Sequence, residues 1–549
     1  RAHPSPFFSI EEGHTCPVGY APTPSLRQAT NFVPRAKRNI VLFLLDDLDE
    51  RVSPYWQAMP FSKRLFQDQG TRFENAFSST SVCCAARCQI LTGLYGHNVG
   101  VLANAGMYGG LEGFKAPHFQ NGTRMKDSQG RCINNENRIL PLMLQQAGYK
   151  TAVWGKYVNG FENDTTNALN FPVPPGWDEF VIPASRGYYS GYNYMLSAWD
   201  SSQAPTNISY EYHGVKDSDY LTDVIRDKAT SWIDKQRRDN DAPLFLYLNP
   251  SAPHFPITAA RRHKSHSSTW SELYNSTVPT RPSFNADVSN KPFYLRNNAA
   301  LRRSWVETPW TRLDFVRRMG SLMAVDEMIE AVYRKFENLD EIDNTVFIMT
   351  SDNGYNHGAF ALSHKMVPYE DSIHIPLYFS KGGVPSGRTI KEPALLIDLA
   401  PTILEFANLQ APDNMDGKSW WRKLMFPNSD MEEERSQMIL QYKKFTPGED
   451  PNSVASEAVP ALFSIIPPAF GLDIPPYRAI RTNRYKLAEW VNGYANGTFT
   501  LEYEAYDLMN DPYELDNIYE TMPSQTKRNL MDSMDALYEC SGRNCWQSD

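Results

Sequence analysis

The chain has 549 residues, of which 41% are hydrophobic and 21% are charged, so its composition is that of a globular protein rather than a disordered one. Its 54 basic and 63 acidic residues give a net charge of −9, and this excludes the sequence-wide basic footprint of a nucleic-acid-binding protein. No apolar run reaches the roughly 18 residues that a membrane-spanning helix needs, so we expect no membrane span. The length alone would suggest three or four domains, but large α/β domains are often longer than average, so we expect two.

Short apolar runs alternate with helical patterns through most of the chain. Residues 1–37 are rich in proline, serine and polar residues, and we expect an extended arm there. The apolar run at 39–45 predicts a fully buried strand. Three further helical patterns each lead into an apolar run. The helical pattern at 138–147 leads into the run at 149–154, that at 220–236 into the run at 244–248, and that at 311–337 into the run at 345–350. Because each strand is an unbroken apolar run, the pattern predicts an α/β fold with a large, mostly parallel sheet between two layers of helices.

The composition changes after residue 412. The stretch 426–475 is irregular and rich in proline, and the segments 477–490 and 498–503 then alternate between apolar and polar residues. Such alternation is typical of antiparallel strands. We therefore expect a catalytic domain at 38–412 and a smaller α+β domain with a short antiparallel sheet at 413–549.

Polar side chains directly follow three of the predicted strands. Asp46 and Asp47 end the first strand, Asp352 and Asn353 follow the strand at 345–350, and His254 follows the strand at 244–248. The carboxyl ends of strands meet at one edge of an open α/β sheet. Three carboxylates and a carboxamide converging there would repel one another without a cation, and such hard oxygen ligands suit Ca²⁺, or Mg²⁺, rather than zinc. Each pair taken singly is equally typical of a turn, so only their combination predicts a metal site.

The segment 81–100, SVCCAARCQILTGLYGHNVG, contains Cys83, Cys84 and Cys88. We expect Cys83 at the N-terminus of a short helix, where free N–H groups favour an anion. Arg87 would lie one turn further on the same face, and a cation one turn from a nucleophile suits oxyanion chemistry. Two other interpretations are a buried cysteine cluster with a structural arginine, and a zinc site of the three cysteines. The zinc interpretation has no support from a paired C-x-x-C or a nearby histidine pair.

This segment resembles the signature of the formylglycine-dependent type I sulfatases, C-x-[PA]-x-R followed closely by L-T-G. The match is C-C-A-A-R at 83–87 and then Leu91-Thr92-Gly93, and the resemblance extends over roughly residues 38–520. It implies an alkaline-phosphatase-like fold and the oxidation of Cys83 to formylglycine by a formylglycine-generating enzyme. It also implies hydrolysis of a sulfate monoester by attack of the formylglycine hydrate on sulfur.

The resemblance further implies roles for residues outside this segment. The expected metal ligands are Asp46, Asp47, Cys83, Asp352 and Asn353. The residues expected to bind sulfate and handle protons are Arg87, Lys156, His254 and Lys365, of which Lys365 or His254 would protonate the leaving alcohol. The motif GKYVNG at 155–160 and the Cys83-Cys84 pair are most similar to the N-acetylglucosamine-6-sulfatase branch, where fungal secreted arylsulfatases also fall. We therefore expect an arylsulfatase, with a sugar 6-sulfate as the alternative substrate.

The signature departs from the usual C-x-P-S-R, because Ala85 and Ala86 replace proline and serine. The modifying enzyme reads this local sequence, so the efficiency of conversion is open. Two alternative functions follow. The same scaffold cleaves phosphate or phosphonate esters, although such relatives generally use an unmodified serine or threonine. A non-catalytic sulfate-ester binder is expected if Cys83 stays a thiol.

The cysteines and sequons favour a secreted or lumenal glycoprotein. Cys540 and Cys545 close a short loop and predict a disulfide, whereas the pairing of Cys16, Cys84, Cys88 and Cys132 is left open. The N-x-[ST] sequon occurs at Asn121, Asn163, Asn207, Asn275 and Asn496. The chain begins with Arg1 rather than methionine, which we interpret as removal of a targeting segment.

Overall fold

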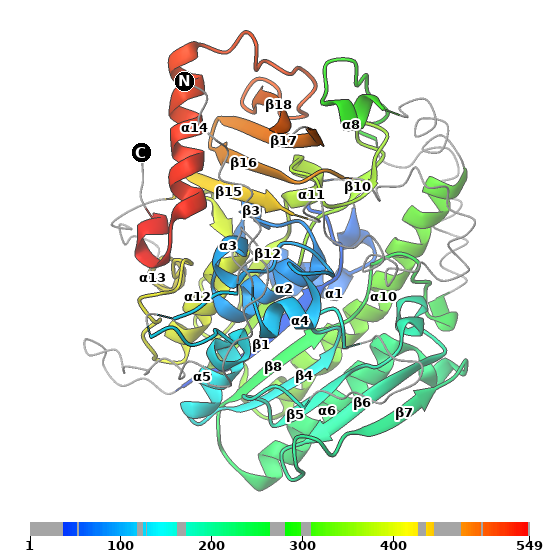
Figure 1. Ribbon diagram of the computed structural model, residues 1–549. Coiled ribbons are helices and arrows are strands. Elements are labelled where there is room, and N and C mark those ends of the chain that lie inside the picture. Colours follow the sequence, from blue (N-terminus) through cyan, green and yellow to red (C-terminus); the bar gives the residue numbers. More distant parts are fainter. Residues whose placement is uncertain are drawn as a thin grey trace.

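A ten-stranded mixed sheet lies at the centre of the fold (Figure 1). The computed structural model describes residues 37–51, 54–117, 124–127, 129–161, 172–263, 280–297, 309–426, 435–443, 474–495 and 498–546. Five neighbouring strands in the middle of the sheet are parallel, and antiparallel neighbours flank them on both sides. The strands in spatial order are β13 (Arg388–Ile390), β2 (Thr71–Phe73), β12 (Leu377–Ser380), β9 (Thr345–Ser351), β1 (Asn39–Leu45), β8 (Leu244–Asn249), β4 (Lys150–Gly155), β5 (Glu179–Pro183), β6 (Tyr194–Asp200) and β7 (Ser209–His213).

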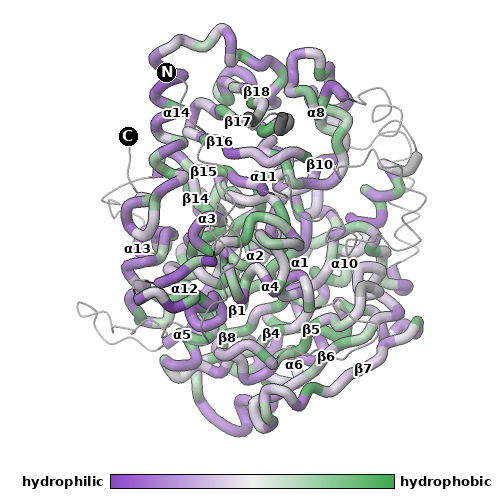
Figure 2. Tube along the Cα trace, in the orientation of Figure 1, coloured by the Kyte–Doolittle hydropathy of each residue, from purple (hydrophilic) through white to green (hydrophobic). Residues whose placement is uncertain are grey.

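Helices cover both faces of this sheet, because the side chains of β1 alternate between two hydrophobic cores. Its residues 41, 43 and 45 pack into a core with α6 (Leu221–Asp239) and α10 (Pro309–Asn338). Its residues 40, 42 and 44 pack into a core with α2 (Cys83–Thr92), α5 (Leu140–Gln146) and α12 (Leu399–Phe406). Hydrophobic residues accordingly gather along the central strands, whereas α14 (Ser524–Glu539) at the periphery is largely hydrophilic (Figure 2). The predicted α/β sandwich is confirmed.

Shorter elements complete this part of the fold. The short helices are α1 (Pro60–Ser62), α3 (Gly96–Val99), α4 (Gly110–Lys115), α8 (Phe293–Arg296), α11 (Glu370–Ile373) and α13 (Trp421–Met425). Two small pairs of strands are β3 (Ala76–Phe77) with β14 (Ala394–Leu395), and β10 (Asn356–His357) with β11 (Ser363–His364). Within the described ranges, no helix combines the length and the apolar character needed to cross a bilayer.

The predicted helices and strands of the sheet are present, with ends that differ by a few residues. The sequence did not predict β6 and β7, which extend one edge of the sheet in antiparallel fashion. The residues of β7, SYEYH, are exposed or half-buried, so this strand carries no apolar run that would mark it. Its pairing with β6 comes from the fold rather than from a local pattern.

A second, four-stranded antiparallel sheet packs against α14 near the C-terminus (Figure 1). Its strands are β15 (Gln437–Tyr442), β16 (Tyr477–Thr482), β17 (Tyr485–Ala495) and β18 (Thr498–Asp507). The predicted antiparallel arrangement is therefore confirmed, and a turn at 483–484 divides the expected segment 477–490 into two strands. One hydrophobic core continues from the large sheet into this small sheet. The division of the chain at residue 412 stays a prediction.

A buried ion cluster joins the small sheet to the chain that precedes β12. Glu370, the first residue of α11, accepts a hydrogen bond from Arg481 Nε at 2.8 Å and pairs with Lys486 Nζ at 2.8 Å. Lys486 also pairs with Glu514 at 2.6 Å, and Glu514 accepts from the Glu370 amide at 2.8 Å. Burial raises the pKa of Glu370, but Arg481 and Lys486 outweigh burial and hold this pKa well below its usual range.

We predict that Glu370→Gln lowers the free energy of unfolding by about 3 kcal/mol, because it leaves buried cations with one carboxylate fewer. Chemical denaturation followed by tryptophan fluorescence measures this change. The control is Arg484→Ala, which removes an ion pair with Asp507. The arginine side chain of this pair is 51% exposed, so we expect the free energy of unfolding to change by less than about 1 kcal/mol. Equal effects of the two variants would show that the buried cluster does not stabilise the fold.

Candidate active site

The acidic residues of the site follow two neighbouring parallel strands. Leu45, the last residue of β1, is in register with Ser351, the last residue of β9. The two strands therefore release residues 46–47 and 352–353 side by side, and all four are buried. The Asp47 amide donates to Asp352 Oδ1 at 3.1 Å and so ties one pair to the other. The strand register thus brings these side chains to one edge of the sheet.

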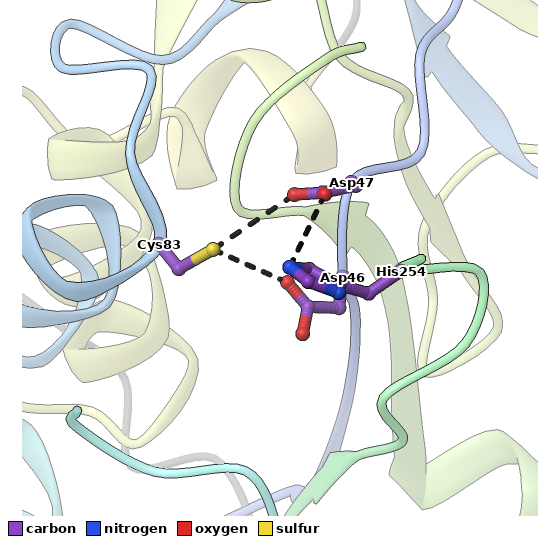
Figure 3. A group of neighbouring side chains, drawn as sticks. All are labelled: Asp46, Asp47, Cys83 and His254. Atoms are coloured by element: carbon purple, nitrogen blue, oxygen red, sulfur yellow. Dashed lines mark hydrogen bonds and ion pairs between the residues drawn. The ribbon is translucent and has the colours of Figure 1, made fainter. Parts of the chain in front are cut away.

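Cys83 approaches this edge of the sheet from the helical layer that contains α2. It is the first residue of α2, it follows Val82 in extended conformation, and it is 1% exposed. Its sulfur lies 3.4 Å from Asp46 Oδ1 and 3.8 Å from Asp47 Oδ1 (Figure 3). Lys365 Nζ contacts the same sulfur at 2.7 Å. The sulfur of Cys83 is therefore surrounded by two carboxylates and one ammonium group.

Lys156 reaches the site from the end of β4. Its Nζ donates to Asp46 at 2.7 Å and 3.0 Å, and its side chain is buried. The preceding Gly155 has a φ of +95°, and a Cβ there would lie 2.0 Å from the carbonyl oxygen of Asn249 on β8. Only glycine fits this close approach of two backbones, so Gly155 lets the chain turn Lys156 towards the acidic pair.

Arg87 lies one helical turn after Cys83, as predicted. Its Nε donates to Asp352 Oδ2 at 2.9 Å, and its guanidinium also donates to the carbonyl of Lys156 at 2.8 Å. A longer ion pair of 3.7 Å links it to Asp46. Arg87 therefore joins the helix that carries Cys83 to residues that follow three strands, β9, β4 and β1.

Lys365 and His254 complete the site from two loops. Lys365 forms a close ion pair with Asp47, and the next amide, that of Met366, donates to the carbonyl of Ser81 at 3.0 Å. His254 Nε2 lies 3.5 Å from Asp47 Oδ2 (Figure 3). With 21% of its side chain exposed, His254 faces solvent more than the other groups, whereas Lys365 is 6% exposed.

The oxygen atoms of this site fit a divalent cation. Ligand atoms of Asp46, Asp47, Cys83 and His254 all lie within 4.8 Å of one another. Asn353 donates from Nδ2 to Asp47 Oδ1 at 2.8 Å, while its buried Oδ1 has no hydrogen-bond partner. A buried amide oxygen of this kind is an acceptor that a hard cation would satisfy.

Asp352 is oriented differently from the other carboxylates. Its Oδ1 accepts from the amides of Asp47 and Asn353, and its Oδ2 accepts from Arg87. Both oxygens are thus already hydrogen-bonded, although an ionised carboxylate offers about four lone-pair sites and can still coordinate a metal. His254, by contrast, lies inside the group of potential ligand atoms although the sequence marked it for proton handling.

Neighbouring charges keep two of the carboxylates ionised. Burial raises the pKa of Asp46, but Lys156, Arg87 and Lys365 outweigh burial and hold this pKa well below its usual range. Burial also raises the pKa of Asp47, which Lys365 nevertheless lowers to about 2. Burial and the charge of Asp46 together raise the pKa of Asp352 to about 6, despite the neighbouring arginine.

Burial and neighbouring charges also shift the pKa values of the thiol and the basic groups. Burial raises the pKa of the Cys83 thiol well above its usual range, although Lys156 and Lys365 favour the thiolate. Burial lowers the pKa of Lys365, but Asp47 outweighs burial and leaves this pKa above its usual value. Burial lowers the pKa of His254 to about 3 even though Asp47 favours the charged ring. At neutral pH the site therefore contains a neutral thiol, a neutral imidazole and charged lysines.

One network of contacts joins the nine predicted site residues, whose roles remain predictions. They are Asp46, Asp47, Cys83, Arg87, Lys156, His254, Lys365, Asp352 and Asn353. Sequence reasoning missed two neighbours of this network. Tyr189 stacks on His254 with ring centroids 4.4 Å apart, and Asn104 Oδ1 accepts from the Cys84 amide at 3.0 Å. Neither residue lies in a motif or at a predicted strand end, so no signal in a single sequence marks them.

The cysteines and sequons can be placed in part. The predicted disulfide between Cys540 and Cys545 is present, with an S–S distance of 2.08 Å. Cys132 is also disulfide-bonded, whereas Cys83, Cys84 and Cys88 are free and buried. In the described part of the chain, the group of potential metal ligands contains neither Cys84 nor Cys88, so the zinc interpretation has no support. Asn207 is exposed. The other predicted positions, Cys16, Asn121, Asn163, Asn275 and Asn496, lie outside the described residues.

Comparison with known proteins decides the family. The profile of the family described as Sulfatase matches residues 38–409. The chain belongs to the sulfatase family. An N-acetylglucosamine-6-sulfatase from Capra hircus is 29% identical over 525 residues, which cover 92% of this chain and 84% of that protein. An extracellular sulfatase SULF-1 homolog from Drosophila melanogaster is 29% identical over 75% of this chain, and the chain spans only 33% of the length of that relative.

The fold agrees with that of a solved structure in this comparison. One solved structure is of a protein in complex with its substrate D-glucosamine-2-N,6-O-disulfate. It superposes on this chain with a TM-score of 0.66, and the match covers 91% of this chain and 97% of the solved one. The two sequences are 20% identical, so the likeness shows the fold alone. The predicted membership of the sulfatase family and the predicted fold are therefore both confirmed.

We predict that the protein binds Ca²⁺ and that Asn353→Ala weakens this binding by about 10-fold or more, because it would remove one of the expected oxygen ligands. Isothermal titration calorimetry on chelator-treated protein measures the affinity. Asn356→Ala is the control, since it removes a buried carboxamide of the same segment that donates to the carbonyl of His364 instead. Equal affinities of the two variants, or stoichiometric zinc by elemental analysis, would contradict the ligand assignment.

Proposed function

We propose that this sulfatase-family chain hydrolyses a sulfate monoester to an alcohol and sulfate. The observation that carries this proposal is the position of Cys83, whose sulfur contacts Asp46, Asp47 and Lys365 at the N-terminus of α2. The positive end of the helix dipole and the nearby cations suit the binding of an anion there. An ester sulfate held at this point would lie against the side chain of residue 83.

The chemistry of Cys83 supports its conversion to formylglycine. As a thiol it is a poor nucleophile, because burial keeps its pKa well above the usual range and the thiolate is the reactive form. Formylglycine at this position would supply a hydrated aldehyde whose oxygen attacks sulfur. A formylglycine-generating enzyme is accordingly the proposed maturation partner, although Ala85 and Ala86 depart from the usual signature.

The proposed ligands of Ca²⁺, with Mg²⁺ as the alternative ion, are Asp46, Asp47, Asp352, Asn353 and residue 83. Such an ion would act as a Lewis acid towards a sulfate oxygen and as a template for the substrate. Arg87, Lys156 and Lys365 would neutralise charge on the transferring sulfonyl group. Their ammonium and guanidinium groups are already held in place by carboxylates, so little reorganisation is required during the reaction.

Two groups can supply a proton to the leaving alcohol. Lys365 is charged at neutral pH and lies beside Cys83. His254 is neutral in the described chain, but it is the more exposed of the two and therefore nearer to the side from which an alcohol can leave. The positions of these groups support both assignments, and a kinetic experiment separates them.

The relatives and the chemistry of residue 83 support the proposed substrate class. An arylsulfatase activity is proposed, and a sugar 6-sulfate is the alternative, because the goat relative is named N-acetylglucosamine-6-sulfatase. Phosphate or phosphonate esters, or sulfate binding without turnover, would require Cys83 to act unmodified. A secreted or lumenal location with N-glycosylation is proposed from the sequons, and a relative named as extracellular supports it.

We predict that purified active protein carries formylglycine at position 83 and not at position 84. Peptide mass spectrometry should show a loss of about 18 Da on residue 83, since sulfur is replaced by oxygen and two hydrogens are removed in forming the aldehyde. Cys83→Ala should abolish hydrolysis of nitrophenyl sulfate. Cys84→Ala, a change at a buried free cysteine next to it, should retain most activity. Full activity with an unmodified Cys83 would refute the proposed reaction.

We predict that loss of the proton donor slows alkyl or sugar sulfates far more than nitrophenyl sulfate, because a good phenolate leaves without help. The measurement is the dependence of log kcat/KM on leaving-group pKa for Lys365→Ala and His254→Ala. The variant with the steeper dependence identifies the donor. Arg87→Ala is the comparison, since it should slow all substrates alike. An unchanged slope in both variants would exclude Lys365 and His254 as donors.

A further inference from the structure

Arg318 is a buried cation that none of the roles above uses. It lies on α10 and is 2% exposed. Its guanidinium donates to two backbone carbonyls, those of Asp47 at 2.6 Å and Pro253 at 2.9 Å, and its Cζ lies 3.8 Å from the ring centroid of Tyr355. Among the residues that the structure describes, this guanidinium forms no ion pair with a carboxylate. A charged group buried without an anionic partner costs several kcal/mol, so a local packing role explains it poorly.

The three partners of Arg318 belong to three loops that carry site residues. Asp47 follows β1, Pro253 precedes His254 after β8, and Tyr355 follows Asn353 after β9. One planar group on α10 therefore contacts the backbone or ring next to two proposed metal ligands and one proposed proton donor. Contacts from Tyr355 extend this link, since its hydroxyl donates to Asp314 at 3.1 Å and lies 3.4 Å from Nδ1 of His364, the residue before Lys365.

The backbone of Asp47 needs such support. Its φ is +68°, a left-handed conformation that costs a residue with a Cβ about 1 kcal/mol or more. The hydrogen bond from Arg318 to the Asp47 carbonyl holds this conformation, which in turn directs the carboxylate towards Asn353, Lys365 and His254. Loss of that bond would change the direction of the carboxylate without removing any group of the site.

We infer that Arg318 is a positioning residue that sets the orientation of Asp47 relative to His254. It touches neither the proposed nucleophile nor the substrate position, and it acts through the Asp47 and Pro253 carbonyls. The inference rests on the proposed function for its kinetic consequence, but its effect on cation binding does not depend on that function. A lysine at this position cannot replace arginine, because the planar guanidinium both spans two carbonyls and stacks on an aromatic ring, whereas a tetrahedral ammonium group has no planar face to stack.

The test compares Arg318→Lys and Arg318→Met with Arg317→Lys, a conservative change at the neighbouring half-buried position of α10. Three quantities are measured for each folded variant: the Ca²⁺ dissociation constant by calorimetry on chelator-treated protein, kcat and KM for nitrophenyl sulfate, and the dependence of rate on leaving-group pKa. We expect Arg318→Lys to raise the Ca²⁺ dissociation constant by about 10-fold and to lower kcat by about 10- to 100-fold with a smaller change in KM, as is typical when a partner of a metal ligand is lost. If His254 is the proton donor, the slope should also steepen, because His254 moves with Pro253. Arg317→Lys should match the wild type in all three quantities.

The outcomes separate a positioning role from a structural one. If Arg318→Lys melts at a lower temperature but keeps wild-type Ca²⁺ affinity, kcat and slope, the inference is overturned. If Arg318→Met does not fold, the Arg318→Lys measurements decide alone. A wild type that binds Ca²⁺ but hydrolyses no sulfate ester would refute the proposed function, while a weaker Ca²⁺ affinity in Arg318→Lys would still support the positioning role.

Discussion

The burial of three carboxylates at one edge of a parallel sheet is the constraint on which the rest of the structure depends. Each ionised group removed from water costs several kcal/mol unless opposite charge and hydrogen bonds compensate it. The compensation for Asp46, Asp47 and Asp352 comes from Arg87 on α2, Lys156 after β4 and Lys365 in a distant loop. Charge neutralisation therefore determines which segments must meet, and it holds the loops of the site to one another.

This charge balance also bears on the proposed binding of a sulfate ester. Three carboxylates and three basic side chains nearly cancel, so the cluster by itself has little attraction for an anion. A bound divalent cation would leave an excess of positive charge in a region of low dielectric, where Coulomb interactions are strong. A singly charged sulfate monoester is an anion that such an excess would hold.

Much of the fold and the chemistry of the site followed from local patterns, and the remainder depended on tertiary contacts. The apolar runs marked β1, β4, β8 and β9, and strand ends placed Asp46 and Asp352 on one edge. No pattern could show that Asp352 turns both oxygens to hydrogen-bond donors, because that depends on Arg87 and two amides. Arg318 was equally hidden, since an arginine within an amphipathic helix usually faces water. Strand β7 lacked an apolar run because its residues remain partly exposed.

The burial of Cys83 has a consequence for the order of events during biosynthesis. In the folded chain its sulfur lies between the sheet edge and α2 with 1% exposure, so no enzyme of ordinary size can reach it there. If Cys83 is converted to formylglycine as proposed, its oxidation would have to precede the docking of α2 onto the sheet, and the modifying enzyme would compete with folding for this segment. Slower folding of this segment would raise the yield of active molecules, and a chain that folds before it meets the enzyme would remain a stable but inactive protein.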